Sequence, residues 1–586
     1  MKKVLSVFLV VFLSACGGGG GDSASSNTPS NTPAVVMTDP LLAYQWHIQD
    51  IGASAFSSTL PVSGNDMNVT GAWAAGYTGK GIKVAIVDSG LEIAHEDLMA
   101  NVDQVNSYNF LNGTNNPTPS ITGGDHGTQV AGIVAAVGFN GKGGRGVAYN
   151  ATLRGYNLLA PGVNSLSNMG FALGGASYSS GNDIFNESFG SVYGSLPPTN
   201  STYQAIAAQT LTLRNGKGAV LVQAAGNEFL DSDMALCTYA NTYQVSCGDP
   251  ATDTRRAGYT PIIVGAFNAD GVKSSYSNAG TAIWVSAPGG EYGVDRAYLP
   301  NLSAVAYKPG IVTTSLDGCS NATTSVFPTN KLNSLNSQGQ NVNAKNCQYT
   351  AIMNGTSSAT PNVSGVVALM LEANSNLSTR DVKHILAKTA KKIDPTNSGV
   401  SSTNILPGAT VVLDQGWVKN TAGNWFSTWY GFGAVDATAA VNMAKTYTSY
   451  LPVVQTNPST LHYLSNTTIP HTTTGVTMSF NMSQSFNTVE EVILFTNLTT
   501  TTALTCNQFE ITSPSGTKSI LLHAANGYSS DGVNYQSSIN NARLLSNAFY
   551  GESASGIWTV RFLDFCSAGR TTFSSTDYQT LSIIGH

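Results

Sequence analysis

Three segments of the sequence each place a reactive side chain where one structural element gives way to another. Asp88 follows the apolar run of VAIVDSG, so we expect it at the carboxyl end of a buried strand. His126 follows two glycines and Asp125 in GGDHGTQVAGIVAA, where the backbone can turn sharply into a helix. Ser357 opens an apolar helix in MNGTSSATPNVSGVVALM, whose Pro361 is tolerated only near the first turn.

A carboxylate, an imidazole and a hydroxyl can together create a nucleophile. A serine hydroxyl attacks poorly until a base takes its proton, and a neutral imidazole can do so near neutral pH. A carboxylate then holds the correct imidazole tautomer and stabilises the imidazolium. We therefore predict Ser357 as the nucleophile, His126 as the base and Asp88 as the residue that orients the base.

A fourth segment, VLVQAAGNEF, supplies a hydrogen-bond donor. Asn227 follows an apolar strand and a glycine, a position from which its amide can donate to a developing oxyanion. The helix that Ser357 opens adds oriented N–H groups and a partial positive charge. We predict an oxyanion site around Asn227.

The segments DSG, HGTQVAG, AAGN and GTSSATP, in the chain order Asp, His, Ser, resemble those of the subtilisin-like proteases. Taken singly, each has a plainer explanation, namely a buried structural aspartate, a capping histidine or a helix-capping serine. Together they imply a serine endopeptidase. The order differs from that of chymotrypsin and of the α/β-hydrolases, and Ser357 lacks the GxSxG elbow of an esterase or lipase.

The resemblance extends to the kexin-like branch and covers roughly residues 39–586. In that branch a C-terminal β-sandwich, the P domain, packs on the catalytic domain and supports its folding, so we expect a stabilising role for it here. The segments that carry the resemblance are DPLLAYQWHI (39–48), SGLEIAHEDL (89–98), GVAYNATLRG (146–155), GVVALMLEANSNLSTRDVKHIL (365–386), SPSGTKSILL (513–522) and LSNAFYGESASGIWTVRFLD (545–564).

The resemblance implies a substrate-binding segment at NESFG, formed by Ser188, Phe189 and Gly190, in which Ser188 and Gly190 would hydrogen-bond an extended peptide; an ordinary edge strand is the alternative. Kexin-like enzymes prefer basic residues through acidic groups that follow this segment. Here SVYGSLPP (191–198) contains none, and Ala257 replaces the acid expected before a GY pair. A basic P1 preference stays open, with other acids as possible substitutes: Glu228, Asp231, Asp233, Asp249 and Asp253.

The family also implies structural Ca²⁺. Its site would draw on Asp39, Asp97 and Asn140, since oxygen ligands on loops suit this ion. Surface carboxylates without a metal are the alternative. Because DPLLAYQWHI resembles the start of the mature domain, too few residues precede it for a folded pro-domain, and we expect a separately encoded or dispensable folding chaperone.

The elements around these residues alternate. KVAIVD, ATLRGYNLL, AVLVQAAGN and PIIVGAFN read as buried strands between helical segments, which predicts an α/β fold with a mostly parallel sheet and helices on both faces. From about Thr456 short alternating runs such as VTMSFNM predict an all-β jelly-roll or sandwich. We therefore expect a catalytic domain over 39–450 and a P domain over 451–586.

The N-terminus is typical of an export signal, with Lys2 and Lys3 before a short apolar run. Its end, Leu13-Ser14-Ala15-Cys16, resembles the bacterial lipoprotein box, which predicts a signal peptide over 1–16 and lipidation of Cys16. An ordinary signal peptide with an incidental cysteine is the alternative. Residues 17–38 have the Gly/Ser/Asn/Pro composition of a flexible linker. We expect an outer-membrane or cell-surface lipoprotein, or a released extracellular protein.

Six further cysteines in an exported chain indicate disulfides. Six cysteines allow 15 pairings, and proximity in the sequence favours three of them: Cys237–Cys247, Cys319–Cys347 and Cys506–Cys566.

The net charge of −6 without a basic block argues against nucleic acid as a partner, and leaves the lipid anchor as the only membrane contact. We expect protein or peptide substrates in extended conformation. A catalytically silent, surface-tethered binding protein that keeps the fold is the main alternative function.

Overall fold

The structure is a computed structural model. It describes residues 38–120, 124–190, 201–251, 261–319, 331–483, 486–499, 502–529, 533–567 and 569–586. The predicted lipidation site Cys16, the linker before Thr38, Asp253, Ala257 and the stretch 191–198 lie outside the described residues.

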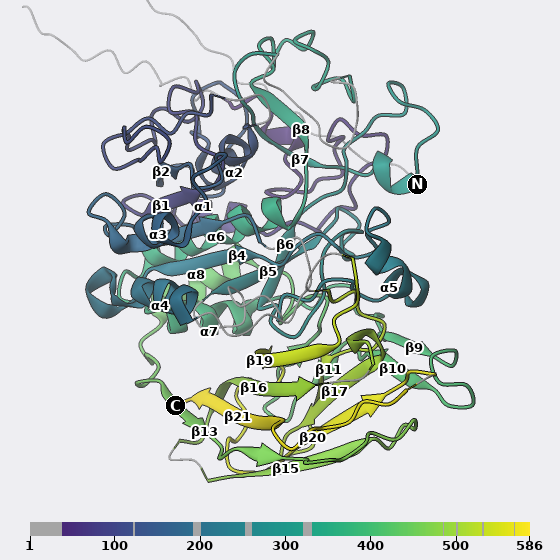
Figure 1. Cartoon of the computed structure of the whole chain (residues 1–586). Coiled ribbons are helices and arrows are strands. Elements are labelled where there is room, and N and C mark those ends of the chain that lie inside the picture. The colour runs from purple at the N-terminus through teal and green to yellow at the C-terminus, as the bar shows by residue number, and fades with distance from the viewer. Residues whose placement is uncertain are drawn as a thin grey trace, which may run out of the picture. The chain divides into compact units, whose positions relative to one another are not determined.

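A six-stranded parallel sheet carries the predicted reactive residues (Figure 1). Its strand order is β2-β1-β3-β4-β5-β6. In such a sheet the carboxyl ends of all strands meet at one edge, so segments that follow different strands are brought together there. The strands are β1 (Lys83–Val87), β2 (Thr152–Tyr156), β3 (Ile184–Glu187), β4 (Val220–Ala224), β5 (Ile262–Phe267) and β6 (Val285–Pro288).

Helices cover both faces of this sheet, as the sequence predicted. In β1, Val84 and Ile86 belong to the same core cluster as helices α2, α6, α7 and α8, whereas Ala85 and Val87 pack with α3 and α4. Successive side chains of one strand point to opposite faces of the sheet, so β1 contributes alternate residues to the hydrophobic cores on the two faces. The helices are α1 (Val69–Ala74), α2 (His126–Ala135), α3 (Leu166–Gly170), α4 (Ser201–Gln209), α5 (Thr238–Tyr243), α6 (Thr356–Ala373), α7 (Thr379–Thr389) and α8 (Ala437–Thr446).

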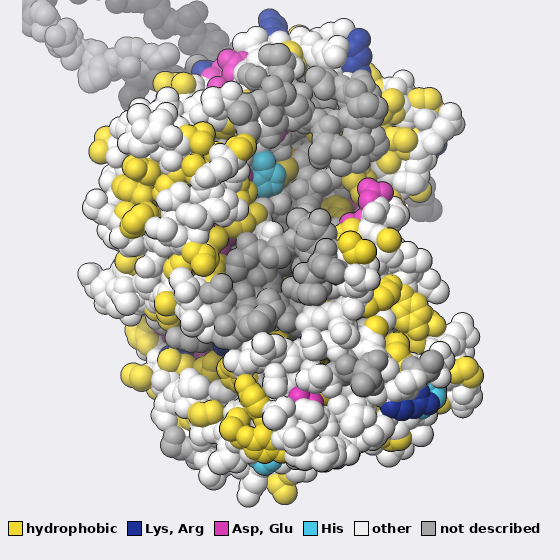
Figure 2. All heavy atoms as spheres, in the orientation of Figure 1, with side chains coloured by type: hydrophobic (Ala, Val, Ile, Leu, Met, Phe, Trp, Pro, Cys, Tyr) yellow, Lys and Arg dark blue, Asp and Glu magenta, His cyan; other side chains and the backbone are white. Residues whose placement is uncertain are grey.

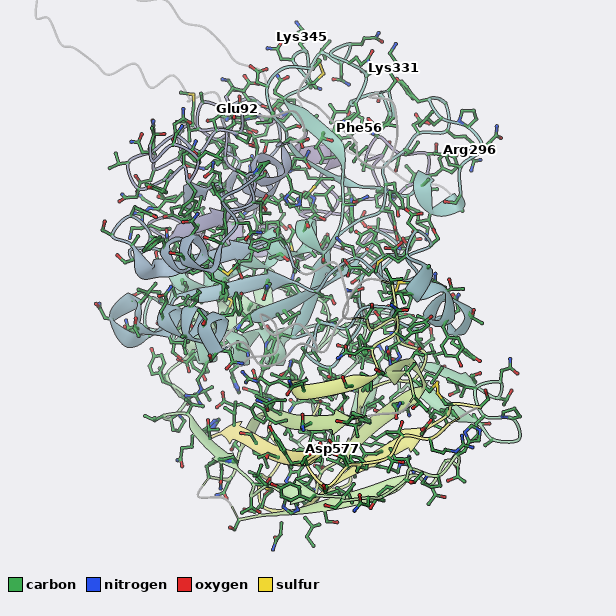
Figure 3. All side chains as sticks on the ribbon, viewed as in Figure 1. Phe56, Glu92, Arg296, Lys331, Lys345 and Asp577 are labelled. Atoms are coloured by element: carbon green, nitrogen blue, oxygen red, sulfur yellow. A yellow bond between two sulfur atoms is a disulfide. The ribbon has the colours of Figure 1, made fainter. Side chains whose placement is uncertain are left out.

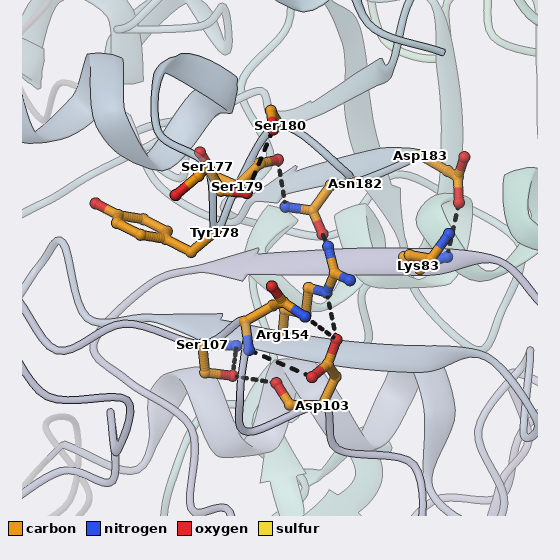
Figure 4. Close-up of polar contacts among 12 residues, drawn as sticks. Lys83, Asp103, Ser107, Arg154, Ser177, Tyr178, Ser179, Ser180, Asn182 and Asp183 are labelled. Atoms are coloured by element: carbon orange, nitrogen blue, oxygen red, sulfur yellow. Dashed lines mark hydrogen bonds and ion pairs between the residues drawn. The ribbon is translucent and has the colours of Figure 1, made fainter.

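A polar network holds the β2 edge of the sheet (Figure 4). The Arg154 side chain, which is buried, pairs through Nε with Asp103 at 2.9 Å and donates through NH1 to Asn182 at 3.3 Å. The Asp183 carboxylate accepts the Lys83 backbone N–H at 3.0 Å. The Arg154 contacts fix β2, whereas the Lys83–Asp183 contact joins β1 and β3 at their amino ends, opposite the carboxyl ends that the reactive residues follow.

An antiparallel pair of strands that was not predicted lies just before Ser357. It consists of β7 (Ile311–Thr314) and β8 (Tyr349–Met353). The connection between these strands is closed by the Cys319–Cys347 disulfide. Lys331 and Lys345 of this connection lie at the end of the view opposite to Asp577 (Figure 3). Two small hairpins also occur: β9 (Val400–Ser402) with β10 (Val411–Asp414), and β11 (Val418–Lys419) with β12 (Trp425–Phe426).

The C-terminal part is a β-sandwich of two antiparallel sheets. One has the order β13-β21-β16-β19, with β14 paired to β21, and the other the order β15-β20-β17-β18. The run VTMSFNM, predicted from the sequence to alternate, forms β15. The strands are β13 (Gln455–Pro458), β14 (His462–Tyr463), β15 (Val476–Met482), β16 (Val489–Thr499), β17 (Asn507–Thr512), β18 (Lys518–Leu522), β19 (Ser538–Ser546), β20 (Gly556–Asp564) and β21 (Tyr578–Gly585).

Ion pairs join the β-sandwich to helix α7. Lys383 Nζ lies 2.6 Å from Glu491 Oε1, and both side chains are buried, at 7% and 3% exposure. Arg380 Nε donates to Glu490 Oε2 at 2.9 Å one turn earlier. Glu490 and Glu491 follow each other in β16, so one strand of the sandwich holds one helix of the α/β part.

All three predicted disulfides are present: Cys237–Cys247, Cys319–Cys347 and Cys506–Cys566. The first lies in an apolar cluster with Ala524, Ala525 and Phe565 of the sandwich. Gly527 passes so close that an added Cβ would lie 2.2 Å from Cys247 Sγ. A disulfide of the α/β part therefore belongs to the contact with the sandwich.

Polar uncharged side chains and backbone dominate the face seen in Figure 2, in keeping with a charged fraction of only 10%. None of the helices in the described ranges combines the length and the apolar character needed to cross a bilayer.

Candidate active site

Asp88 and His126 are in direct contact. Asp88 directly follows β1, and its backbone is held by hydrogen bonds to Tyr156 and Leu159. His126 is the first residue of α2, and its Nδ1 lies 2.7 Å from Asp88 Oδ1. The Asp88 side chain is fully buried, whereas that of His126 is 34% exposed. The imidazole thus has one edge on a buried carboxylate and is only partly open to solvent.

Gly127 permits this approach. A Cβ at Gly127 would lie 2.0 Å from the Gly90 carbonyl oxygen and 3.0 Å from Asp88 Cβ. Any larger residue would therefore push the start of α2 away from the end of β1. The glycine in HGT has a steric reason that the sequence alone did not reveal.

Two carboxylates act on His126. Burial of the ring favours the neutral form, but the charges of Asp88 and Asp125, with the hydrogen bond from Asp88, raise the pKa of His126 above its ordinary value. Asp125 is itself buried beside α2, where it accepts a hydrogen bond from Gln129 Nε2 at 2.6 Å. Burial raises the pKa of Asp125, while the neighbouring imidazole opposes that rise.

Ser357 lies at the N-terminal end of α6, beside the end of β3. Its Oγ donates to the Ser188 carbonyl at 2.9 Å, and Ser188 Oγ donates to the Ser357 carbonyl at 2.9 Å. Among the described residues, no hydrogen bond joins Ser357 Oγ to His126. In this arrangement the hydroxyl must rotate before it can give its proton to the imidazole.

Asn227 is oriented by the residue before Ser357. Asn227 Oδ1 accepts from the Thr356 backbone N–H at 2.8 Å and from Thr356 Oγ1 at 3.0 Å. Because the oxygen is occupied, the amide Nδ2 is directed elsewhere as a donor. The side chain is therefore fixed at the start of α6.

Two N–H donors converge beside Gly355. A Cβ placed on Gly355 would lie 3.3 Å from Asn227 Nδ2 and 3.3 Å from the Ser357 backbone nitrogen. The Ser357 N–H is in the first turn of α6, where no helical acceptor exists. With a φ of +99°, Gly355 leaves open a space that both donors reach. An oxygen atom in that space would accept two hydrogen bonds.

The predicted substrate segment leaves the carboxyl end of β3, which lies between β1 and β4 and is not an edge strand. Ser188 touches Ser357, and the partly buried Phe189 packs against the α3 and α4 core. Gly190 is the last described residue before the gap.

Among the described candidate acids for a basic preference, Glu228 directly follows the oxyanion donor Asn227. Its Oε2 accepts the Asn227 backbone N–H at 3.0 Å. Asp231 Oδ1 accepts the Asp233 N–H at 2.8 Å within the next loop. Asp249 is buried and interacts with Tyr528 of the sandwich. The Asp249 carboxylate is therefore engaged with the sandwich, and we do not propose it as a specificity residue.

The three predicted calcium ligands come together. Asn140 Nδ2 lies 2.7 Å from Asp97 Oδ1, and the Asn140 backbone N–H donates to Asp39 Oδ1 at 3.1 Å. Arg145 pairs with the other oxygen, Asp39 Oδ2, at 2.6 Å. Asp97 Oδ2 is buried and has no hydrogen-bond partner among the described residues. An unpaired buried carboxylate oxygen beside an amide and a second carboxylate fits a hard cation.

Burial raises the pKa of Asp97 to about 8, and the charge of Asp39 adds to this effect. Within the described ranges no three His, Cys, Asp or Glu side chains gather as a metal site. A cation at this place would therefore need oxygen ligands other than the two carboxylates.

Several residues of this site were not found from the sequence. Asp125 adjoins His126 and could have been considered for that reason alone. Thr356 and Gly355 lie inside a recognised segment, but their contacts with Asn227 span more than 120 residues. No sequence pattern signalled the Ser188–Ser357 pair.

Comparison with known families and proteins agrees with this geometry. Residues 79–433 match the model of the subtilase family, and residues 489–575 match that of the proprotein convertase P-domain. The Aeromonas extracellular serine protease of Aeromonas sobria is 35% identical over 556 residues, covering 91% of this chain and 85% of that protein. Human neuroendocrine convertase 2 is 28% identical, covering 89% of this chain and 70% of that protein.

Solved structures agree as well. The serine protease of Aeromonas sobria superposes with a TM-score of 0.83 at 31% identity, covering 97% of this chain and 99% of that one. The same protease in complex with a chaperone gives a TM-score of 0.81 at 30% identity, covering 94% and 95%.

Proposed function

The chain belongs to the subtilase family and is a serine protease, and on this premise we propose that it is an exported endopeptidase that cuts peptide bonds with Ser357, His126 and Asp88. The observation that carries the proposal is that the Asp88–His126 pair, the Ser357–Ser188 contact and the donor Asn227 all involve segments that follow β1, β3 and β4 at the carboxyl ends of one parallel sheet.

In the proposed mechanism, His126 takes the Ser357 proton as Oγ attacks the scissile carbonyl carbon. Asp88 stabilises the imidazolium that forms. The carbonyl oxygen, now negative, accepts hydrogen bonds from Asn227 Nδ2 and the Ser357 N–H. His126 then gives its proton to the leaving amine, and water reverses the steps to release the acyl group.

Substrate binding would also release the nucleophile. An extended peptide that hydrogen-bonds the Ser188 segment would compete for the Ser188 carbonyl, which accepts the Ser357 hydroxyl in this structure. The displaced hydroxyl could then turn toward His126. This ordering would make the hydroxyl most reactive when a peptide is in place.

A fluorophosphonate label tests the assignment of the nucleophile. Wild-type protein should be labelled, and Ser357→Ala should not be. Ser358→Ala is the matched control, because Ser358 Oγ is buried and donates to Gly289 and Gly355 carbonyls instead. Absence of labelling in folded wild-type protein would contradict the proposal and favour the surface binding protein.

We propose a preference for basic P1 residues. The candidate acid is Glu228, whose Oε2 accepts the Asn227 backbone N–H. Cleavage profiling with a peptide library tests this preference. Enrichment of Arg or Lys before the cut that is lost in Glu228→Gln supports it, and an unbiased wild-type profile contradicts it.

We also propose that Asp39, Asp97 and Asn140 hold a structural Ca²⁺, which would neutralise the buried Asp97 carboxylate when bound. Chelation should lower the melting temperature of wild-type protein and leave that of Asp97→Ala unchanged. An unchanged wild-type melting temperature in chelator would contradict this site.

A separate folding chaperone is proposed as a partner. The support is the solved complex of the Aeromonas sobria protease with a chaperone, together with the family match. Refolding the isolated chain from denaturant tests the need for one. Full recovery of activity without helper protein would contradict it.

We propose export and lipidation at Cys16, with the protein at the cell surface or released. The related Aeromonas protease is named as extracellular. Intact mass and N-terminal analysis of the mature protein decide between the alternatives. An acylated N-terminal Cys16 supports the anchor, whereas a free N-terminus beyond residue 16 contradicts it.

A further inference from the structure

The loop of residues 273–279, between β5 and β6, contacts both sides of the proposed oxyanion site. On one side, the Gly355 N–H donates to the Tyr276 hydroxyl at 2.8 Å. The same hydroxyl donates to the Gly290 carbonyl at 2.7 Å. The Gly355 carbonyl in turn accepts the Ser358 N–H at 3.0 Å. Gly355 is therefore held at both ends of its backbone.

On the other side, Asn278 of this loop holds the backbone around Asn227. Asn278 Oδ1 accepts the Glu228 N–H at 2.8 Å, and the Asn278 N–H donates to the Gly226 carbonyl at 3.0 Å. Gly226 and Glu228 are the two neighbours of Asn227. The loop thus fixes the peptide units that precede and follow the amide donor.

The loop is itself anchored by a buried amine. Lys273 Nζ donates to the carbonyls of Ser274 at 2.9 Å and Ser277 at 3.1 Å, and lies 3.4 Å from the centre of the Phe229 ring. The side chain of Glu291 accepts the Ser275 N–H at 2.8 Å. With carbonyl and amide groups of the loop both bound, its main chain has little room to shift.

We propose that Tyr276 is a positioning residue of the oxyanion site, whose hydroxyl sets Gly355 and thereby the spacing between Asn227 Nδ2 and the Ser357 N–H. This inference rests on the proposed proteolytic function. Gly355 lies two residues before Ser357, and a Cβ built on it would lie 3.3 Å from each donor, so a rotation of Gly355 would move the Ser357 N–H relative to Asn227 Nδ2. Oxyanion donors act only where the developing charge forms, and small displacements are costly for rate.

The ring and the hydroxyl of Tyr276 have separable roles. The ring belongs to the large core cluster, and the side chain is buried. Tyr276→Phe keeps the ring and removes the hydroxyl, which accepts the Gly355 N–H and donates to the carbonyls at Gly289 and Gly290. Misplaced donors should lower kcat by about tenfold, less than the 10²–10³-fold expected for a lost donor, with KM unchanged.

Ser277→Ala is the matched control. Ser277 Oγ is buried and accepts the Ala266 N–H at 3.0 Å, so its loss also leaves one buried N–H without that acceptor, but in β5 and not at Gly355. Both variants should lose comparable thermal stability. Only Tyr276→Phe should lower kcat and weaken binding of a peptide aldehyde, whose tetrahedral adduct carries an oxyanion.

The experiment measures kcat, KM and peptide-aldehyde affinity for wild type, Tyr276→Phe, Ser277→Ala and Ser357→Ala. A selective loss of kcat and aldehyde affinity in Tyr276→Phe supports the inference. Equal kcat in wild type and Tyr276→Phe, or equal losses in both loop variants, overturns it while the protease function stands. A folded wild type without Ser357-dependent hydrolysis overturns the proposed function and this inference with it.

Discussion

The α/β part and the β-sandwich each bury a carboxylate against a basic side chain, but with different consequences. Asp88 faces His126, whose imidazole is 34% exposed and can gain or lose a proton near neutral pH. Glu491 faces Lys383, and both are almost fully buried. The first pair is open to a substrate and can exchange protons; the second is closed and joins two parts of the chain. Both pairs contain a buried carboxylate, so the carboxylate does not distinguish them. The exposure of the basic side chain and its ordinary pKa decide whether the pair can take part in proton transfer or only joins two parts of the chain.

The largest expected effect comes from breaking the closed pair. Lys383→Met would leave the Glu491 carboxylate buried without its cation and should destabilise the protein by about 3–5 kcal/mol. Thermal unfolding measures the loss. The double variant Lys383→Met with Glu491→Leu should recover most of it, because neither charge of the pair remains. A wild-type melting temperature for the single variant would contradict the role of this pair.

In the open site, the matching test is removal of the amide donor. Asn227→Ala should lower kcat by about 10²–10³-fold, or about 3–4 kcal/mol, with little change in KM. Because Asn227 Oδ1 accepts the buried Thr356 N–H, the variant should also lose about 1–3 kcal/mol of stability. Steady-state kinetics on a peptide amide give both constants. If kcat stays within a few-fold of wild type, Asn227 does not donate to the oxyanion.

The contact between the two parts can be weakened without touching a charge. Replacing Cys237 and Cys247 by Ser removes the disulfide that packs on the sandwich and should cost about 3 kcal/mol, given its separation of 10 residues. Differential scanning calorimetry measures this loss. Activity per folded molecule should be unchanged, and a selective loss of activity would show that this contact reaches the site.

The smallest effect is a shift in pH dependence. Since the base must be neutral to act, kcat/KM should rise through the raised pKa of His126, so the acidic limb has its midpoint above about 6.5. Asp125→Asn removes one of the charges that raise this pKa and should move the limb to lower pH. Asp317→Asn, an exposed acid that does not act on His126, is the control. A limb that does not move would contradict the influence of Asp125.

The sequence predicted what short segments encode. Asp88 follows a strand, and His126 and Ser357 each lie at the start of a helix, so the hydrophobic pattern of the adjoining segment was enough to place them. Proximity of the cysteines in the sequence was enough to predict all three disulfides. Contacts between distant segments were not predicted. Tyr276 contacts Gly355, and Asp249 contacts Tyr528, because folding brings distant segments together. The periodic pattern of hydrophobic residues within a single segment carries no information about such contacts. The β7–β8 pair was missed because a long connection separates its two short strands.

The central claim is that Ser357 is a nucleophile activated by the Asp88–His126 pair. Mass-spectrometric mapping of a fluorophosphonate adduct, with its formation rate followed against pH, tests this claim most directly. The account predicts a single adduct on Ser357, formed faster as pH rises through the pKa of His126 and not formed in His126→Ala. An adduct on another residue, or labelling of Ser357 that persists unchanged in His126→Ala, would contradict it.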